Sequence, residues 1–484
     1  MIIFVGNEMK MKRIQGLKII EKQGVAARIQ GLMPARKQGV AARIQGLLLV
    51  VAALVPLVCG GEIVKGELRE SATYPGTTHS YEVWVPDRYD GSRPACLYVG
   101  LDGQLCNAVA VMDSLMTVGK MPVTIGVFLQ PGVVKDAEGN VLRYNRSNEF
   151  DMTDGTFARF IETELLPAVE RTVTADGRRV RLSPDGNDHM IFGLSSGGIA
   201  AFTAAWLRPD LFRRVFSGVG TFVTMRGGND LQMWVRKREP QRLKICLQDG
   251  TEDVWNPIFG HWYEGNRMLA TALDFAGYQT KYDWSDCNHG VKRASEIFAE
   301  VMEWMWQGYP NDIVTGTTQN GLLAEILVPG SRWEQLDKNV WSQYAWSGWH
   351  TYYPDSTLRV EHYSPMHGNW LWQSTRLPDG TYGNAQRFYF LHSYDNRPLE
   401  RGVGTAFDAA GYLWVLTSAG IQICDQNGRV RGVIDAPPCD CRVQCSIAIV
   451  DGAVVVASPA GIWRRVFHVK APVPGMTPKS QGQG

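Results

Sequence analysis

Residues 190–201 read MIFGLSSGGIAA and join two different patterns. The run from Met190 to Leu194 is short and almost uniformly apolar, as buried parallel strands are. Small and apolar residues then predict a helix from Gly198 to Leu207. Between the two, Gly193-Leu-Ser-Ser-Gly197 has the form G-x-S-x-G, in which a tight turn from strand to helix holds a serine with its hydroxyl outward. Ser195 is therefore the predicted nucleophile.

The same alternation extends outward on both sides of this turn. Apolar runs predict strands at 81–85, 96–101, 121–129, 215–219, 243–248 and 279–284, and helical periodicity appears at 155–172, 264–276 and 294–307. Strands and helices in alternation predict a mostly parallel sheet covered on both faces. The fold class expected is α/β, an α/β-hydrolase three-layer sandwich.

A serine needs a general base, and the base needs an orienting group. In this fold an acid and then a histidine follow the nucleophile along the chain. His289 comes just after the strand at 279–284 and is the predicted base. Asp253 follows the strand at 243–248 and is the predicted acid, in preference to Asp249, which is typical of a turn, and Glu252, which is typical of a solvated loop.

The oxyanion of an acyl-transfer intermediate also needs hydrogen-bond donors. The backbone N–H of Ser196 is one candidate. The second is expected in the loop that follows the strand at 96–101, Asp102-Gly-Gln104.

Composition narrows the remaining classes. The 484 residues have a formal net charge of +1 with 20% charged residues, so the excess of cations that nucleic-acid binding needs is missing. Cys439, Cys441 and Cys445 lie close together, but no histidine accompanies them, and a disulfide or thiols are expected there in place of a metal. No metal and no cofactor are expected.

Residues 1–61 read as a leader. The stretch KQGVAARIQGL occurs at 22–32 and again at 37–47, which indicates duplicated coding sequence, with the true start at Met33. Basic residues then precede an apolar run at 47–58, which predicts a signal peptide too short to span a membrane. We expect a secreted or periplasmic protein, with a lipid anchor on Cys59 as the alternative.

The texture changes after about residue 311. Helical periodicity ends, and short strands alternate with turns, as in the similar segments 411–421 and 452–462. Four parts are expected: the leader (1–61), the α/β-hydrolase domain (62–312), a β-rich domain (313–472) and a disordered tail rich in Pro, Gly, Gln and Ser (473–484).

Residues 66–306 resemble the enterochelin esterase-like and feruloyl esterase-like α/β-hydrolases. The resemblance is carried by DGQ at 102–104, RSNEFD at 146–151, GLSSGG at 193–198, GTED at 250–253 and the His-Gly pair at 289–290. It implies Ser195, Asp253 and His289 as the triad and Gln104 and Ser196 as backbone donors. It also implies that Arg146, Glu149 and Asp151 lie near the site and shape it.

Residues 322–473 resemble part of a gluconolactonase- or regucalcin-type β-propeller, most clearly in 404–421 and 461–466. The segment is too short for a closed ring and lacks the acidic residues that bind metal in that family, so neither lactonase activity nor calcium is expected. A remnant that packs on the esterase, binds carbohydrate or pairs with another chain is expected.

Together these features predict an exported serine carboxylic ester hydrolase that acts through an acyl-enzyme on an acylated carbohydrate or a siderophore-type ester. Trp255 and His261 are the further candidates for the substrate side of the site. An acyltransferase with the same triad and a non-catalytic carbohydrate-binding protein are the alternatives.

Overall fold

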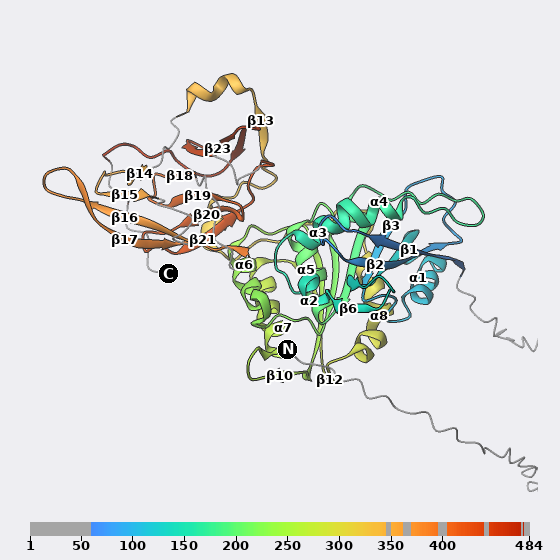
Figure 1. Ribbon diagram of the computed structural model, residues 1–484. Coiled ribbons are helices and arrows are strands. Elements are labelled where there is room, and N and C mark those ends of the chain that lie inside the picture. The colour runs from blue at the N-terminus through green and yellow to red at the C-terminus, as the bar shows by residue number, and fades with distance from the viewer. Residues whose placement is uncertain are drawn as a thin grey trace, which may run out of the picture. The chain divides into compact units, whose positions relative to one another are not determined.

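The computed structural model describes residues 60–344, 350–361, 369–394, 404–439, 445–475 and 478 (Figure 1). The signal peptide, Met33, Cys59, Cys441 and most of the tail lie outside these residues. None of the described helices combines the length and apolar character needed to cross a membrane.

A ten-stranded sheet forms the centre of the first part of the chain. Its order is β12-β9-β8-β7-β3-β4-β2-β5-β6, with β1 paired to β2. The six strands from β12 to β4 are parallel, and the strands beyond β4 are antiparallel. The mostly parallel sheet expected from the sequence is therefore confirmed. The strands are β1 (Gly61–Arg69), β2 (Thr78–Pro86), β3 (Cys96–Leu101), β4 (Thr124–Leu129), β5 (Val133–Lys135), β6 (Val141–Tyr144), β7 (His189–Leu194), β8 (Arg214–Gly218), β9 (Lys244–Glu252) and β12 (Gln279–Asn288).

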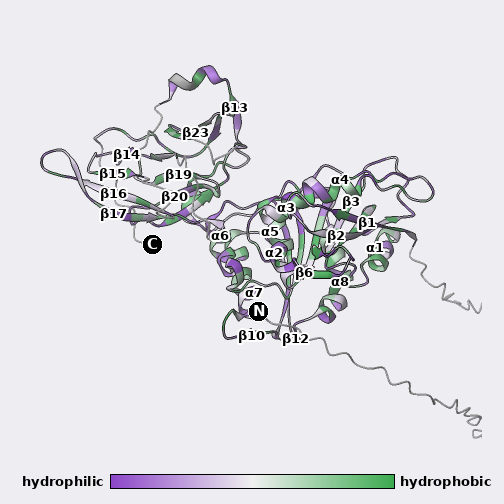
Figure 2. Ribbon diagram, in the orientation of Figure 1, coloured by the Kyte–Doolittle hydropathy of each residue, from purple (hydrophilic) through white to green (hydrophobic). Residues whose placement is uncertain are grey.

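Both faces of the central strands are buried, and the strands are coloured as hydrophobic in Figure 2. Alternate residues point to opposite faces: on β3, Leu97 and Val99 pack in one core cluster and Tyr98 in the other. The Tyr98 face is covered by α1 (Ala108–Thr117) and α8 (Val291–Trp306). The opposite face is covered by α2 (Arg146–Phe150), α3 (Thr156–Phe160), α4 (Leu166–Val169), α5 (Ser196–Leu207), α6 (Leu231–Lys237) and α7 (Trp262–Ala276).

The helix expected at 155–172 is interrupted by a π-helical turn at Ile161–Leu165 between α3 and α4. Pro167 follows this turn and has no N–H to donate to the carbonyl four residues earlier. The wider turn accommodates that missing bond, so the helix continues with its apolar side on the sheet.

Within the described residues after α9 (Gly321–Ile326), the C-terminal part contains three four-stranded antiparallel sheets. The β-rich character expected from the sequence is present, whereas the resemblance to a propeller is not confirmed by these small sheets. They are formed by β14 (His350–Tyr352), β15 (Leu358–Glu361), β16 (Trp370–Arg376) and β17 (Tyr382–Phe390); by β18 (Thr405–Phe407), β19 (Leu413–Thr417), β20 (Gly420–Cys424) and β21 (Val430–Ile434); and by β13 (Glu334–Leu336), β24 (Gly461–Val466), β23 (Ala453–Ser458) and β22 (Ser446–Val450).

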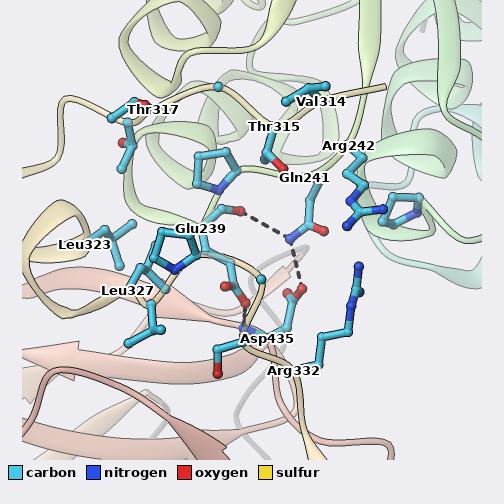
Figure 3. A pocket seen from close by; sticks show the side chains of 18 of the residues that line it. Glu239, Gln241, Arg242, Val314, Thr315, Thr317, Leu323, Leu327, Arg332 and Asp435 are labelled. Atoms are coloured by element: carbon cyan, nitrogen blue, oxygen red, sulfur yellow. Dashed lines mark hydrogen bonds between the residues drawn. The ribbon is translucent and has the colours of Figure 1, made fainter. Parts of the chain in front are cut away.

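Ion-pair and hydrogen-bond contacts connect the segment after α6 to these sheets. Glu239 is buried and binds the Arg465 guanidinium through both carboxylate oxygens, at 2.9 and 2.7 Å. Its Oε1 also accepts the backbone N–H of Asp435 at 2.7 Å, and the Gln241 side chain donates to Asp435 Oδ2 at 2.9 Å (Figure 3). These residues line a cavity of about 740 Å³, which also borders α9 (Gly321–Ile326).

Candidate active site

The turn between β7 and α5 holds Ser195 in a strained conformation, with φ 57° and ψ −121°. Its backbone N–H donates to the carbonyl of Gly218 at 3.0 Å, which ties the turn to β8. A Cβ atom on Gly193 would lie 2.1 Å from the carbonyl oxygen of Gly197. The turn is therefore too tight for a side chain at 193, which is the physical reason for the glycine in the motif.

The structure brings the three predicted triad side chains together in one hydrogen-bonded chain. His289 Nε2 lies 3.0 Å from Ser195 Oγ, and His289 Nδ1 lies 2.6 Å from Asp253 Oδ1. Asp253 follows β9 and His289 follows β12, and these neighbouring parallel strands end at the same edge of the sheet. This edge is where open α/β sheets place their sites.

Asp253 lies in surroundings that favour its ionised form. Burial alone would raise the pKa of its carboxyl, but the hydrogen bond with His289, the contact with Asp249, the charge of His289 and the N–H of Val254 together outweigh burial and hold the pKa below its usual value. The Val254 N–H lies 2.5 Å from Asp253 Oδ1. A carboxylate at Nδ1 keeps the proton of the imidazole there and leaves Nε2 free to accept the proton of Ser195.

The loop predicted to supply an oxyanion donor approaches the start of α5. Asp102 and Gly103 have positive φ values of 63° and 83°, and the N–H of Gly103 donates to Leu129 O at 3.0 Å. A Cβ on Gly197 would lie 3.0 Å from Asp102 Oδ2, so this loop and the helix start are close neighbours. Ser196 is the first residue of α5, where N–H groups lack intrahelical acceptors. The donor roles of Ser196 and Gln104 stay predictions.

Arg146, at the start of α2, connects this loop to the nucleophile strand. Its Nε and Nη2 bind the two carboxylate oxygens of Asp102 at 2.6 and 2.7 Å, and Nη2 also donates to Leu194 O at 3.3 Å. A bidentate guanidinium fixes a carboxylate in orientation as well as position. Arg146 thus holds the Asp102 loop against the strand that carries Ser195.

Glu149 and Asp151 are buried in the packing around α2. Glu149 is hydrogen-bonded to the His79 ring at 3.0 Å and accepts the N–H of Gly132 at 3.0 Å. Asp151 accepts the hydroxyl of Ser147 at 2.5 Å. Both side chains are thus engaged in positioning α2, and the contact that α2 makes with the candidate site comes from Arg146.

Trp255 and His261 face each other across a short hairpin of β10 (Trp255–Asn256) and β11 (Gly260–His261). The hairpin begins two residues after Asp253. Trp255 is 65% exposed and His261 is half-buried. The hairpin therefore presents an aromatic ring to solvent beside the segment that carries the predicted acid, and its contact with substrate stays a prediction.

Two further side chains lie beside the predicted triad, and one of them, Thr221, was missed by the sequence analysis. Thr221 Oγ1 lies 3.5 Å from Ser195 Oγ and accepts the indole N–H of Trp262 at 3.3 Å. The Trp262 ring stands edge-on to His289, 6.2 Å between centroids. Thr221 comes three residues after β8, and its place at the sheet edge where the other strands end is the signal that could have found it.

The parallel sheet, its two helical layers and the serine turn define the fold as that of an α/β-hydrolase. The model of the family described as "Putative esterase" matches residues 72–344, more than half of the chain. The chain belongs to this family of esterases.

Solved structures with a similar fold include a ferulic acid esterase, 19% identical with a TM-score of 0.40, for which the match covers 51% of this chain and 99% of the other. The enterobactin esterase of Shigella flexneri is 21% identical with a TM-score of 0.38, and that of Salmonella typhimurium is 18% identical with a TM-score of 0.39. Those matches cover 51% of this chain and 59% and 58% of the two enterobactin esterases. No curated protein sequence matches the chain.

Proposed function

We propose that the protein is a serine carboxylic ester hydrolase with Ser195 as nucleophile, His289 as general base and acid, and Asp253 as the residue that orients His289. The observation that carries the proposal is the continuous hydrogen-bonded chain from Ser195 Oγ through the imidazole to Asp253. Membership of an esterase family supports the same reaction class.

The proposed reaction uses this geometry as follows. Ser195 Oγ attacks the ester carbonyl carbon while its proton passes to His289 Nε2, 3.0 Å away. The negative charge on the carbonyl oxygen is stabilised by backbone N–H groups, with Ser196 and Gln104 as our candidates. The imidazolium then protonates the leaving alcohol oxygen, and an acyl-enzyme remains. Water, deprotonated by His289, attacks the acyl carbon, releases the acid and regenerates Ser195.

The test is the Ser195→Ala variant with p-nitrophenyl acetate as substrate. Removing the nucleophile is expected to reduce kcat/KM by about 10³-fold or more, with unchanged circular dichroism. Ser114→Ala, an exposed serine on α1, is the matched control and should keep wild-type activity. Retained activity in Ser195→Ala would contradict the proposed mechanism.

For the substrate we propose an acylated carbohydrate, such as a feruloyl or acetyl ester, or a siderophore-type ester, met outside the cytoplasm after export. A panel of acetyl, feruloyl and siderophore esters compared by kcat/KM tests this class. Added alcohol provides the second arm: transfer of the acyl group to the alcohol in preference to water would favour an acyltransferase. Binding of these carbohydrates without turnover would favour a binding protein.

We also propose that the C-terminal sheets are a propeller-like remnant. In two of them the strands follow one another in chain order. In the third the order is β13-β24-β23-β22, so that β13, which comes earlier in the chain, pairs with β24 at the edge of the sheet. The first strands β14, β18 and β22 lie next to one another in succession, as the inner strands of successive blades do. An experimental structure in which the three sheets share no axis would remove this proposal.

A further inference from the structure

A second carboxyl group, that of Asp249, lies fully buried beside the proposed triad. It stands on β9, four residues before Asp253. Its Oδ1 accepts the backbone N–H of Gly250 at 2.7 Å, and its Oδ2 accepts the amide of Asn266 on α7 at 2.6 Å. The triad mechanism as described above has no use for this group.

The two oxygens of the Asp253 carboxyl differ in the hydrogen-bond donors that lie near them. Oδ1 accepts from both His289 and the N–H of Val254. Oδ2 is buried and faces no donor if every neighbouring carboxyl is ionised. The Asp249 carboxyl lies within hydrogen-bonding reach of Asp253. Two carboxylates cannot hydrogen-bond to each other, so one shared proton is needed to satisfy Oδ2.

Several observations locate that proton on Asp249. Asp253 accepts two N–H donors on Oδ1, one of them from a ring that becomes cationic, and these favour its charged form. Burial, together with the contact with Asp253 and the charge of Asp253, raises the pKa of Asp249 well above its usual value. Two adjacent buried groups whose environments separate their pKa values in this way divide into one acid and one carboxylate.

The other elements packed around Asp249 contribute neutral groups. Asn266 from α7 also donates to the carbonyl of Gly220, in the segment after β8. On β12, Trp284 is the register partner of Asp249, and the Cys287 thiol packs against Gly250. Among these contacts the charged groups are Asp253 and, when protonated, His289 behind it.

We propose that Asp249 is a positioning residue whose carboxylic acid donates its proton to Oδ2 of Asp253 and thereby fixes the carboxylate that orients His289. This inference rests on the proposed triad. It gives Asp253 a donor on each oxygen and leaves one negative charge, not two, behind the imidazole. Asparagine can replace such an acid because it keeps a donor toward Asp253 and one acceptor, whereas alanine cannot.

The first experiment compares Asp249→Asn and Asp249→Ala by the pH profile of kcat/KM for p-nitrophenyl acetate. We expect Asp249→Asn to stay within about tenfold of wild type with an unmoved acidic limb. Asp249→Ala should lose about 10–100-fold, because the buried Asp253 oxygen is left without a donor. Glu252→Gln, an exposed carboxyl of the same segment, is the control and should behave as wild type. If Asp249 is ionised, Asp249→Asn removes a negative charge near His289 and shifts the acidic limb to lower pH, which would overturn the proposal.

The second experiment does not depend on activity. Infrared difference spectra of wild type against Asp249→Asn at pH 7 should contain the carbonyl stretch of a protonated carboxylic acid, and the same band should persist in Ser195→Ala. Absence of that band overturns the inference about Asp249 even where Ser195→Ala is inactive. A protein that shows the band but keeps its activity in Ser195→Ala refutes the proposed triad instead, so the two failures are distinguishable.

Discussion

Arg146 shows how a single side chain can hold two parts of the candidate site in register. Its guanidinium binds both oxygens of Asp102, in the predicted oxyanion loop, and the carbonyl of Leu194, next to the predicted nucleophile. The Asp102 loop has positive backbone φ values and therefore needs external contacts to keep its shape. An oxyanion donor is useful only if its N–H is fixed before the charge develops.

We predict that Arg146→Lys lowers kcat/KM about tenfold and Arg146→Ala about 100-fold, because a lysine keeps the charge but cannot form the two parallel hydrogen bonds. The loss should fall mainly on kcat, since an oxyanion contact is made in the transition state. Steady-state kinetics with p-nitrophenyl acetate measures this split. Arg143→Lys, an exposed arginine on β6, is the control. A pure change in KM for Arg146→Lys would assign the residue to substrate binding instead.

At this scale, chain order was the useful signal. Ser195, Asp253 and His289 each follow a strand, in the order along the chain that the fold requires. The structure places them in hydrogen-bonding contact. Thr221 and Asp249 carry no motif, because their significance arises only from what lies across the sheet edge from them. Residues that are close together in a motif can have different roles. Arg146 contacts the Asp102 loop, whereas Glu149, three residues later, is buried against His79.

At the scale of elements, the β7–α5 turn depends on close backbone approach. A Cβ at position 193 would meet the backbone carbonyl of Gly197 at 2.1 Å, and backbone cannot move aside as a flexible side chain can. Gly155, which precedes α3, offers a contrast because nothing lies within 4 Å of its Cβ position and its φ of −76° suits any residue.

We predict that Gly193→Ala destabilises the fold by about 1–3 kcal/mol or more and abolishes activity, because the turn must open to relieve the overlap. Gly155→Ala should leave both unchanged. Urea unfolding and p-nitrophenyl acetate turnover measure the two effects. A stable and fully active Gly193→Ala protein would mean that the turn is looser than its geometry indicates.

The sequence predicted these elements well where burial is two-sided. Continuous apolar runs located β3, β4, β7, β8 and β9, whose buried positions leave little choice of structure. The strands β1, β5 and β6, at the antiparallel end of the sheet, were missed, because much of their surface is exposed and their sequences have no long apolar run. The π-helical turn before Pro167 was also missed, since periodicity reports the buried side of a helix and not its hydrogen-bond pattern.

At the scale of the whole molecule, polar and aromatic contacts connect α6 of the hydrolase part to the C-terminal part. Lys237, at the end of α6, donates to Nε2 of His392 at 2.8 Å, and the ring of Trp234 stacks on Tyr394 at 4.3 Å. The hydrogen bond from Lys237 needs a neutral His392 imidazole, because a protonated ring has no lone pair to accept it and would place two cations side by side.

The stability of the protein should therefore depend on the charge state of His392. Burial, and then the charge of Lys237, lower the pKa of His392 from 6.5 to about 4. Between these two pH values His392 binds a proton in the unfolded chain but not in the folded one. Its contribution to the free energy of unfolding is therefore present above pH 6.5 and is lost as the pH falls toward 4. Wild type should lose about 2 kcal/mol more unfolding free energy between pH 7.5 and pH 5 than His392→Gln, which keeps an acceptor for Lys237 but does not titrate. Urea unfolding at the two pH values measures the difference.

The buried His189, whose pKa burial also lowers, contributes equally to both proteins. His468→Gln, a substitution at an exposed histidine, is the control and should lose as much unfolding free energy as wild type between the two pH values. Equal losses in wild type and His392→Gln would contradict the prediction.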